Sequence, residues 1–96
     1  MHVITRQRLL EFAVGHPEAA EPLDVWYRIV KASGFQNPED LRRTFGTASF
    51  LGEGLTVFHI GGNKFRLVVR MRYDLQRAYI ARVMTHGEYD QWSPVD

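Results

Sequence analysis

Cysteine is absent from the 96 residues of this sequence, which excludes a disulfide framework and thiolate metal sites. No apolar run approaches the length needed to cross a bilayer, and the first six residues lack the apolar stretch of a signal peptide. We therefore expect a cytoplasmic protein that has no membrane partner. Histidine pairs and carboxylate clusters with the spacing of metal ligands are also lacking, so we expect neither a metal nor a small-molecule cofactor.

The chain also lacks an excess of one charge, because its 12 Lys and Arg residues nearly balance its 11 Asp and Glu residues and the net charge is +1. The cations are nevertheless concentrated in one part of the chain, at Lys64, Arg66, Arg70, Arg72, Arg77 and Arg82. A local basic face can attract a polyanion even when the whole chain is nearly neutral. A chain of this length has room for one core, so we expect a single domain over residues 1–96.

Residues 55–60 and 64–73 read as the two strands of a hairpin, because Gly61, Gly62 and Asn63 between them tolerate the positive φ of tight turns. The second strand alternates an apolar set with a basic set. The apolar set is Phe65, Leu67, Val69, Met71 and Tyr73, and the basic set is Lys64, Arg66, Val68, Arg70 and Arg72. A two-residue turn puts Phe58 and Ile60 on the apolar face and His59 on the basic face, beside Lys64 or Arg66.

Residues 78–84 predict a third strand, which is apolar on both sides, so alternation does not decide which face is core. Earlier in the chain, Val3 and Ile4 suggest a short strand. Helices are predicted for residues 6–13 with Thr5 as N-cap, for a segment that begins between Pro17 and Pro22 and ends at Ser33, and after Asn37. Residues 46–54 read as a loop. This order of elements predicts an α+β fold in which helices cover one face of an antiparallel sheet.

The end of the third strand carries the candidate chemistry. Thr85 followed by Glu88 is a capping box, which predicts a short helix that begins at His86. The helix dipole disfavours a protonated imidazole at this position, and Tyr89 and Asp90 share the same helical face. We therefore expect a neutral histidine, a phenol and a carboxylate to converge near the basic face.

Two interpretations of this face stay open from the residues alone. Alternating cations are most often the solvated side of a sheet, and a histidine at a helix start is most often a capping or packing residue. Cations that alternate along a strand can instead follow a phosphate backbone, with nearby tyrosines stacking on bases. An enzyme that uses His86 for acid–base chemistry and a non-catalytic module that binds RNA, the ribosome or a protein would both use such a face.

Three segments together resemble the HigB toxins of bacterial toxin–antitoxin systems, namely residues 61–67, residues 79–80 and residues 83–90. The first five residues share the likeness, which spans almost the whole chain. The resemblance implies a RelE-like fold, with an N-terminal strand and helices packed on one face of an antiparallel sheet and a short C-terminal helix. It also implies a type II toxin, an endoribonuclease (mRNA interferase) that cleaves mRNA, usually on the translating ribosome, until a HigA-type antitoxin neutralises it.

By this likeness Asn63, Arg66, His86 and Tyr89 belong to the active surface. RNA supplies its own nucleophile in the 2′-hydroxyl, so the chemistry needs alignment, proton transfer and charge stabilisation rather than a metal. We hypothesise that His86 is the general acid or base, that Arg66 holds the scissile phosphate, and that Tyr89 orients the hydroxyl or stacks on a base. Asp90 would orient the imidazole. The predicted RNA-binding residues are Asn63, Lys64, Arg70, Arg72, His59 and Arg82.

Overall fold

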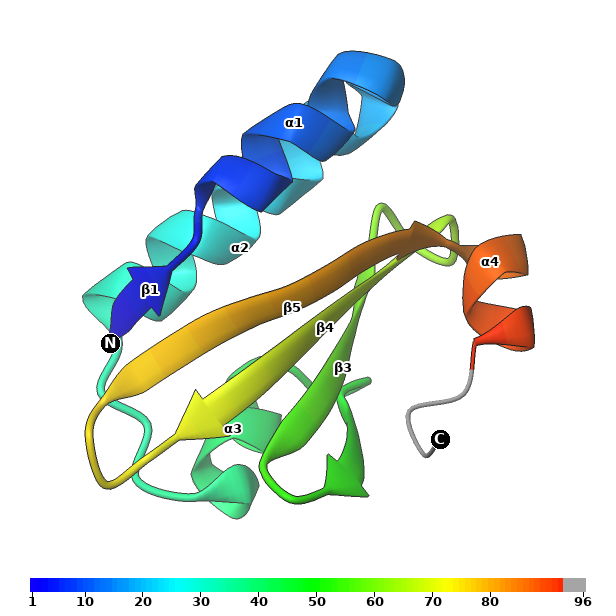
Figure 1. Cartoon of the computed structure of the whole chain (residues 1–96). Coiled ribbons are helices and arrows are strands. Elements are labelled where there is room, and N and C mark those ends of the chain that lie inside the picture. The colour runs from blue at the N-terminus through cyan, green and yellow to red at the C-terminus, as the bar shows by residue number, and fades with distance from the viewer. Residues whose placement is uncertain (93–96) are drawn as a thin grey trace.

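The computed structural model describes residues 1–92, which form a five-stranded sheet with helices on both sides. In chain order the elements are β1 (His2–Ile4), α1 (Gln7–Gly15), the 3₁₀ turn η1 (Pro17–Ala19), α2 (Ala20–Ala32), α3 (Pro38–Thr44), β2 (Ser49–Gly52), β3 (Leu55–Ile60), β4 (Phe65–Arg72), β5 (Arg77–Thr85) and α4 (His86–Gln91). The strand order is β1-β5-β4-β3-β2, with β1 parallel to β5 and the other pairs antiparallel. The predicted α+β fold is confirmed (Figure 1).

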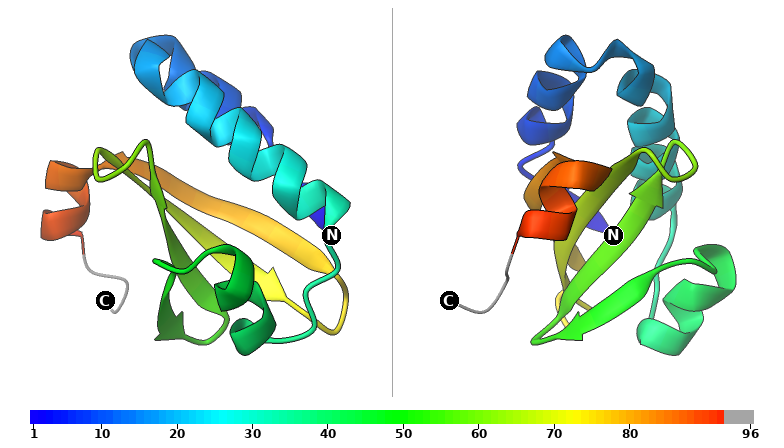
Figure 2. Two further views of the ribbon diagram at one scale, coloured as in Figure 1. Left: turned by 180° about the vertical axis from the view of Figure 1, so that it is seen from behind. Right: turned by 90° about the vertical axis from the view of Figure 1, so that its right-hand side faces the viewer.

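Helices α1, α2 and α3 cover one face of the sheet, which we call the inner face. Their buried residues include Leu9, Leu23 and Leu41, which join Phe58 and Leu67 of the sheet in one apolar cluster. The right-hand view of Figure 2 shows α3 and α4 on opposite sides of the sheet. None of the helices within residues 1–92 has the length and apolar character needed to span a bilayer.

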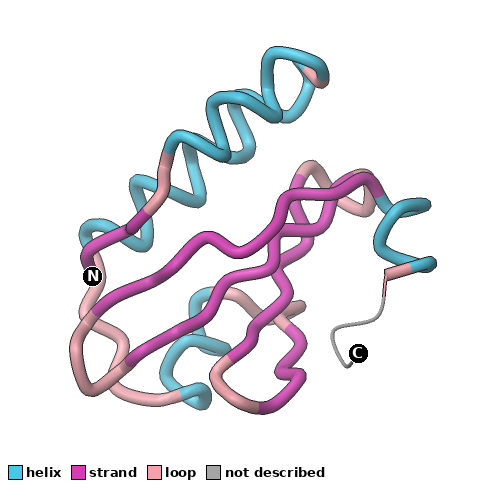
Figure 3. The backbone as a smooth tube through the Cα atoms, in the orientation of Figure 1, coloured by secondary structure: helices cyan, strands magenta, loops and turns pink. Residues whose placement is uncertain are grey.

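The opposite side, which we call the outer face, carries a second and smaller apolar cluster. Val57, Val68 and Met84 are buried there, and Tyr89 and Trp92 at the C-terminal end pack against them. Figure 3 shows how β5 leads directly into α4 at one end of the sheet. Helix α4 therefore covers one end of the outer face, and no other helix within residues 1–92 lies on that side.

The hairpin register agrees with the prediction. Phe58 pairs with Leu67 and Ile60 with Phe65 on the inner face, and His59 pairs with Arg66 on the outer face. The connection between the strands spans residues 61–64, four residues rather than the expected two. Both loop lengths are even numbers, so every side chain keeps its predicted face. Gly61 and Gly62 have φ values of 64° and 71°, which glycine adopts without a steric cost.

A β-bulge explains why alternation did not orient the third strand. Val68 of β4 pairs with Arg82, but its neighbour Val69 pairs with Ile80, so Ala81 has no partner opposite it. An extra residue of this kind reverses the facing of all the residues that follow it. Ile80 before the bulge therefore belongs to the inner cluster, and Met84 after it belongs to the outer cluster.

Two local predictions are wrong. Thr5 does not cap α1, because its φ of 71° turns the chain from β1 into the helix and Arg6 is the N-cap residue, without a side-chain hydrogen bond. The predicted loop over residues 46–54 contains β2, since Phe50 is half-buried against the inner cluster and pairs with Thr56. The cap at Asn37 is confirmed by a bond of 2.8 Å from the Asp40 backbone N–H to its side-chain oxygen.

Candidate active site

Arg66 lies on the outer face near the start of β4, beside α4, and is only 6% exposed. Its guanidinium donates to the Asn63 side-chain oxygen at 2.8 Å and to the backbone carbonyls of Asn63 and Phe65 at 3.3 and 3.2 Å. The Tyr89 ring faces the guanidinium, with 5.8 Å between the ring centroid and Cζ. The expectation that the basic face is open to solvent is therefore wrong at Arg66, because α4 folds back over this end of the sheet.

Helix α4 is fixed to the hairpin through its first residue. The His86 backbone N–H donates to the Lys64 carbonyl at 2.9 Å. The predicted capping box is confirmed, since the Glu88 N–H donates to the Thr85 hydroxyl at 3.2 Å and the Thr85 N–H donates to the Glu88 carboxylate at 2.8 Å. These bonds place the half-buried His86 side chain next to the loop that carries Asn63.

Asp90 contacts the His86 ring from the next turn of α4. The two side chains are four residues apart, and Nε2 lies 3.4 Å from the carboxylate oxygen Oδ2. This contact can hold the ring in one orientation and stabilise positive charge that develops on it. The structure thus brings His86 and Asp90 into contact, while Tyr89 on the same helix lies over Arg66.

His59 of β3 pairs with Arg66 of β4 and is half-buried. Burial lowers the pKa of its imidazole below 6.5, and the positive charges of Arg66 and His86 lower it further. A neutral imidazole can accept a proton, so His59 has the electrostatic character of a general base. His59 therefore joins His86 and Arg66 in one cluster, which we call the histidine–arginine cluster.

The remaining predicted residues fall into two groups. Asn63, Lys64 and Arg82 are exposed and adjoin the cluster, with Arg82 above the Trp92 ring at 5.9 Å. Arg70 and Arg72 lie toward the opposite end of β4, where the Arg70 guanidinium donates to the Glu53 carbonyl. Arg72 is six residues from Arg66, roughly 20 Å along an extended strand, so the structure does not bring it to the cluster.

Arg72 is also neutralised locally. Its guanidinium donates to both Asp74 carboxylate oxygens, at 3.0 and 2.8 Å. That hydrogen bonding lowers the pKa of Asp74 and raises the pKa of Arg72. A polyanion would have to compete with this carboxylate for the same donors.

Two residues near the cluster were missed by sequence reasoning. His16 stacks on Phe12 at a centroid distance of 4.1 Å and meets the edge of Phe65 at 5.8 Å. Phe65 pairs with Thr85, the N-cap residue of α4, so this histidine packs against the strand that adjoins the start of α4. No local pattern links His16 to α4, whereas the spacing of Tyr89 and Trp92 along the helix could have identified Trp92.

The fold and the cluster define a class of small α+β protein with a RelE-like arrangement of helices and sheet. The chain belongs to the HigB toxin family, described as the RelE-like toxic component of a toxin–antitoxin system, whose sequence model matches residues 19–92. It is 33% identical over 98 residues to a protein of Escherichia coli K12 named mRNA interferase toxin HigB, covering 99% of this chain and 93% of that protein.

Two further relatives agree. A Shigella flexneri protein named mRNA interferase HigB is 33% identical over 98 residues, with 99% of this chain and 93% of the relative covered. A protein of the same name from Escherichia coli O6:H1 is 28% identical over 93 residues, with 95% of this chain and 90% of the relative covered. The resemblance to the HigB toxins is confirmed, and membership of this family implies an antitoxin partner.

Proposed function

We propose that this chain is a single RelE-like toxin domain over residues 1–96 and acts as an endoribonuclease that cleaves mRNA in the cytoplasm. The observation that carries the proposal is the histidine–arginine cluster, in a chain that is 33% identical to a protein named mRNA interferase toxin HigB. Two imidazoles and a fixed cation in one place are the groups that RNA cleavage needs.

The reaction begins with the 2′-hydroxyl of the substrate. Neutral His59 takes the hydroxyl proton while the 2′-oxygen forms a bond to the adjacent phosphorus. The bond from phosphorus to the 5′-oxygen then breaks, and His86 gives a proton to that oxygen. The products are an RNA ending in a 2′,3′-cyclic phosphate and an RNA beginning with a 5′-hydroxyl. This role requires the protonated imidazole rather than the neutral ring expected from the helix dipole, and Asp90 at 3.4 Å is placed to stabilise it.

Arg66 stabilises the extra negative charge of the phosphorane from a fixed position. Its hydrogen bonds to Asn63 and the backbone hold the guanidinium in place before the substrate arrives, which is the condition for effective electrostatic catalysis. Tyr89 covers Arg66 and presents a ring edge and hydroxyl to a base or to the attacking ribose. Lys64, Asn63 and Arg82 bind the flanking phosphates, because they are exposed beside the cluster.

The wider context follows from the family. We propose that a HigA-type antitoxin neutralises the chain and that cleavage takes place on the translating ribosome, where mRNA is presented as a single strand. A metal is not required in this scheme, because the nucleophile and both proton carriers are organic groups.

The experiment is translation of a defined message with and without the protein, followed by mapping of new RNA ends. New 5′-hydroxyl ends that appear only with the wild-type chain are expected. The His86→Ala, Arg66→Ala double variant should produce none above background. Cleavage at the wild-type rate by the double variant would refute the assigned site, and inhibited translation with uncut RNA would favour the non-catalytic binding module.

A further inference from the structure

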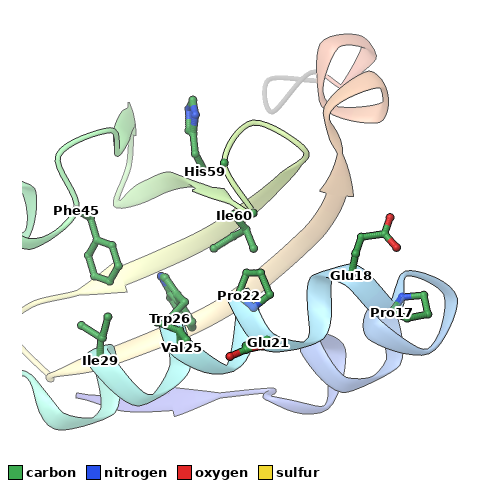
Figure 4. A pocket seen from close by; sticks show the side chains of 12 residues that line it. Pro17, Glu18, Glu21, Pro22, Val25, Trp26, Ile29, Phe45, His59 and Ile60 are labelled. Carbon is green, nitrogen blue, oxygen red and sulfur yellow. The ribbon is translucent and has the colours of Figure 1, made fainter.

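A groove with a volume of about 690 Å³ lies between α2 and the end of β3, beside the candidate active site. Its helical wall is formed by Pro22, Val25, Trp26 and Ile29, whose spacing places all four on one face of α2. Figure 4 shows these side chains opposite Phe45 and Ile60, with His59 pointing away to the other side of its strand. The groove is therefore largely apolar and adjoins the candidate active site, since His59 lies at its rim with the ring turned away from α2.

The strand side of the groove is an open sheet edge. β2 pairs with β3 only as far as Val57, so within residues 1–92 the outer edge at residues 58–60 has no strand beside it. Such an edge presents unpaired backbone N–H and C=O groups, which an extended peptide can satisfy by adding as a further strand. A strand in this position would have the α2 side chains directly beneath it.

Trp26 supplies a second sign that the groove is incomplete. This side chain is only 2% exposed, yet its indole Nε1 has no hydrogen-bond partner among the described residues. A buried N–H without an acceptor carries a free-energy cost, because it has lost its hydrogen bonds to water. Trp26 lines the groove, so a bound segment that turns this indole slightly toward itself can supply the missing acceptor from a backbone carbonyl.

The charges of the lining favour a protein over RNA. Glu18 and Glu21 are the charged residues among those that form the groove, which include no Lys or Arg. Two carboxylates repel a phosphate backbone and attract a cationic side chain. Val25 contributes exposed apolar surface, with 42% of its area accessible. These features fit an extended polypeptide that carries apolar side chains and at least one Lys or Arg.

We propose that this groove binds an extended segment of the antitoxin, which adds to the open edge of β3. Its apolar side chains face Val25 and Ile29, and a cationic side chain meets Glu18 and Glu21. The inference rests on the proposed function for the identity of the partner. Because Gly61 and Gly62 line the groove and begin the loop that carries Asn63, the bound segment lies at the border of the active site.

The test compares two valine substitutions on the full chain. Val25→Glu places a charge in the groove, while Val14→Glu, at a valine that is 83% exposed on α1, places the same charge outside it. Binding of the purified HigA-type antitoxin to each variant is measured by calorimetry. Cleavage of mRNA is measured separately, without antitoxin. We expect Val25→Glu to weaken binding at least about thirtyfold and Val14→Glu to leave it within about twofold.

Cleavage should be unchanged in both variants, so failure of the proposed function shows as uncut RNA with the wild-type chain and is distinguishable from failure of the inference. Glu21→Lys should weaken binding by roughly three- to tenfold, chiefly through slower association, whereas Glu39→Lys in the first turn of α3 should not. Amide hydrogen exchange at residues 58–60 should slow on complex formation. Equal binding by both valine variants, unchanged exchange there, or a Val25→Glu variant that loses only RNA cleavage would each overturn the proposal.

Discussion

At the α4 end of the outer face Arg66 is buried beneath Tyr89, whereas toward the opposite end of the same strand Arg72 is exposed and paired with Asp74. Both arginines occupy alternate positions of one strand and have the same predicted facing. Their surroundings differ because α4 covers one end and a turn with a carboxylate follows the other. Alternation along the strand thus assigns each side chain to a face of the sheet. The neighbouring elements decide whether its charge is paired with a carboxylate, as at Arg72, or has no carboxylate partner within residues 1–92, as at Arg66.

We expect the largest loss of mRNA cleavage from a substitution of His86, at the α4 end of the outer face. His86→Ala removes one of the two proton carriers, so we expect mRNA cleavage to fall by about 10² to 10⁴-fold. His2→Ala is the matched control, since His2 is exposed on β1 and away from α4. The initial rate of appearance of new RNA ends measures both. A His86→Ala variant as active as His2→Ala would remove this histidine from the mechanism.

The next largest effect is the difference in mRNA cleavage between Arg66→Ala and Arg72→Ala. Arg66→Ala removes the preorganised cation, with an expected loss of about 10² to 10³-fold in cleavage. Arg72→Ala should lower cleavage by less than about threefold, because Asp74 already neutralises that side chain and a single surface phosphate contact contributes little. The thermal midpoint of each variant is measured alongside, to separate loss of chemistry from loss of fold. Equal losses of cleavage at both positions would mean that all the arginines on the outer face of β4 bind RNA as one surface.

Much of this fold could be predicted from local signals. The hairpin register followed from the parity of the apolar residues, and α4 followed from the capping box at Thr85 and Glu88. The bulge at Ala81 and the strand inside residues 46–54 were missed, because both depend on pairing with a neighbouring strand rather than on local pattern. The burial of Arg66 was missed for the same reason, since the residue that covers it is 23 positions away in the chain.

Substitution of the capping residue Thr85 should have a smaller effect. Thr85→Ala removes the side-chain acceptor for the Glu88 N–H, so unfolding free energy should fall by about 1 kcal/mol. Cleavage should fall as well, because α4 positions His86 and Tyr89. Urea denaturation measures the first quantity, and Thr85→Ser, which keeps the hydroxyl, should restore most of both. A variant with unchanged stability would show that packing of Trp92 and Tyr89 alone holds the helix.

The smallest predicted effect is the pH dependence that His59 adds. Burial and the charges of Arg66 and His86 lower its pKa in the folded state below 6.5, so the unfolded chain binds its proton first as the pH falls. Stability from this residue is fully present above the unfolded pKa and is lost as pH falls through the folded pKa. Unfolding free energies between pH 7.5 and 5.5 should therefore decline less steeply in His59→Gln than in His2→Gln. Parallel curves would contradict the assignment of a lowered pKa.

The most direct measurement of where the chemistry lies is the backbone amide NMR spectrum of the wild-type chain titrated with a short RNA that carries 2′-O-methyl groups and cannot be cleaved. Our account predicts that the largest shift changes fall on His59, on residues 63–66 and on residues 86–89. Changes centred on Arg72 and Arg77, with the α4 end unaffected, would place the RNA at the wrong end of the sheet and contradict it.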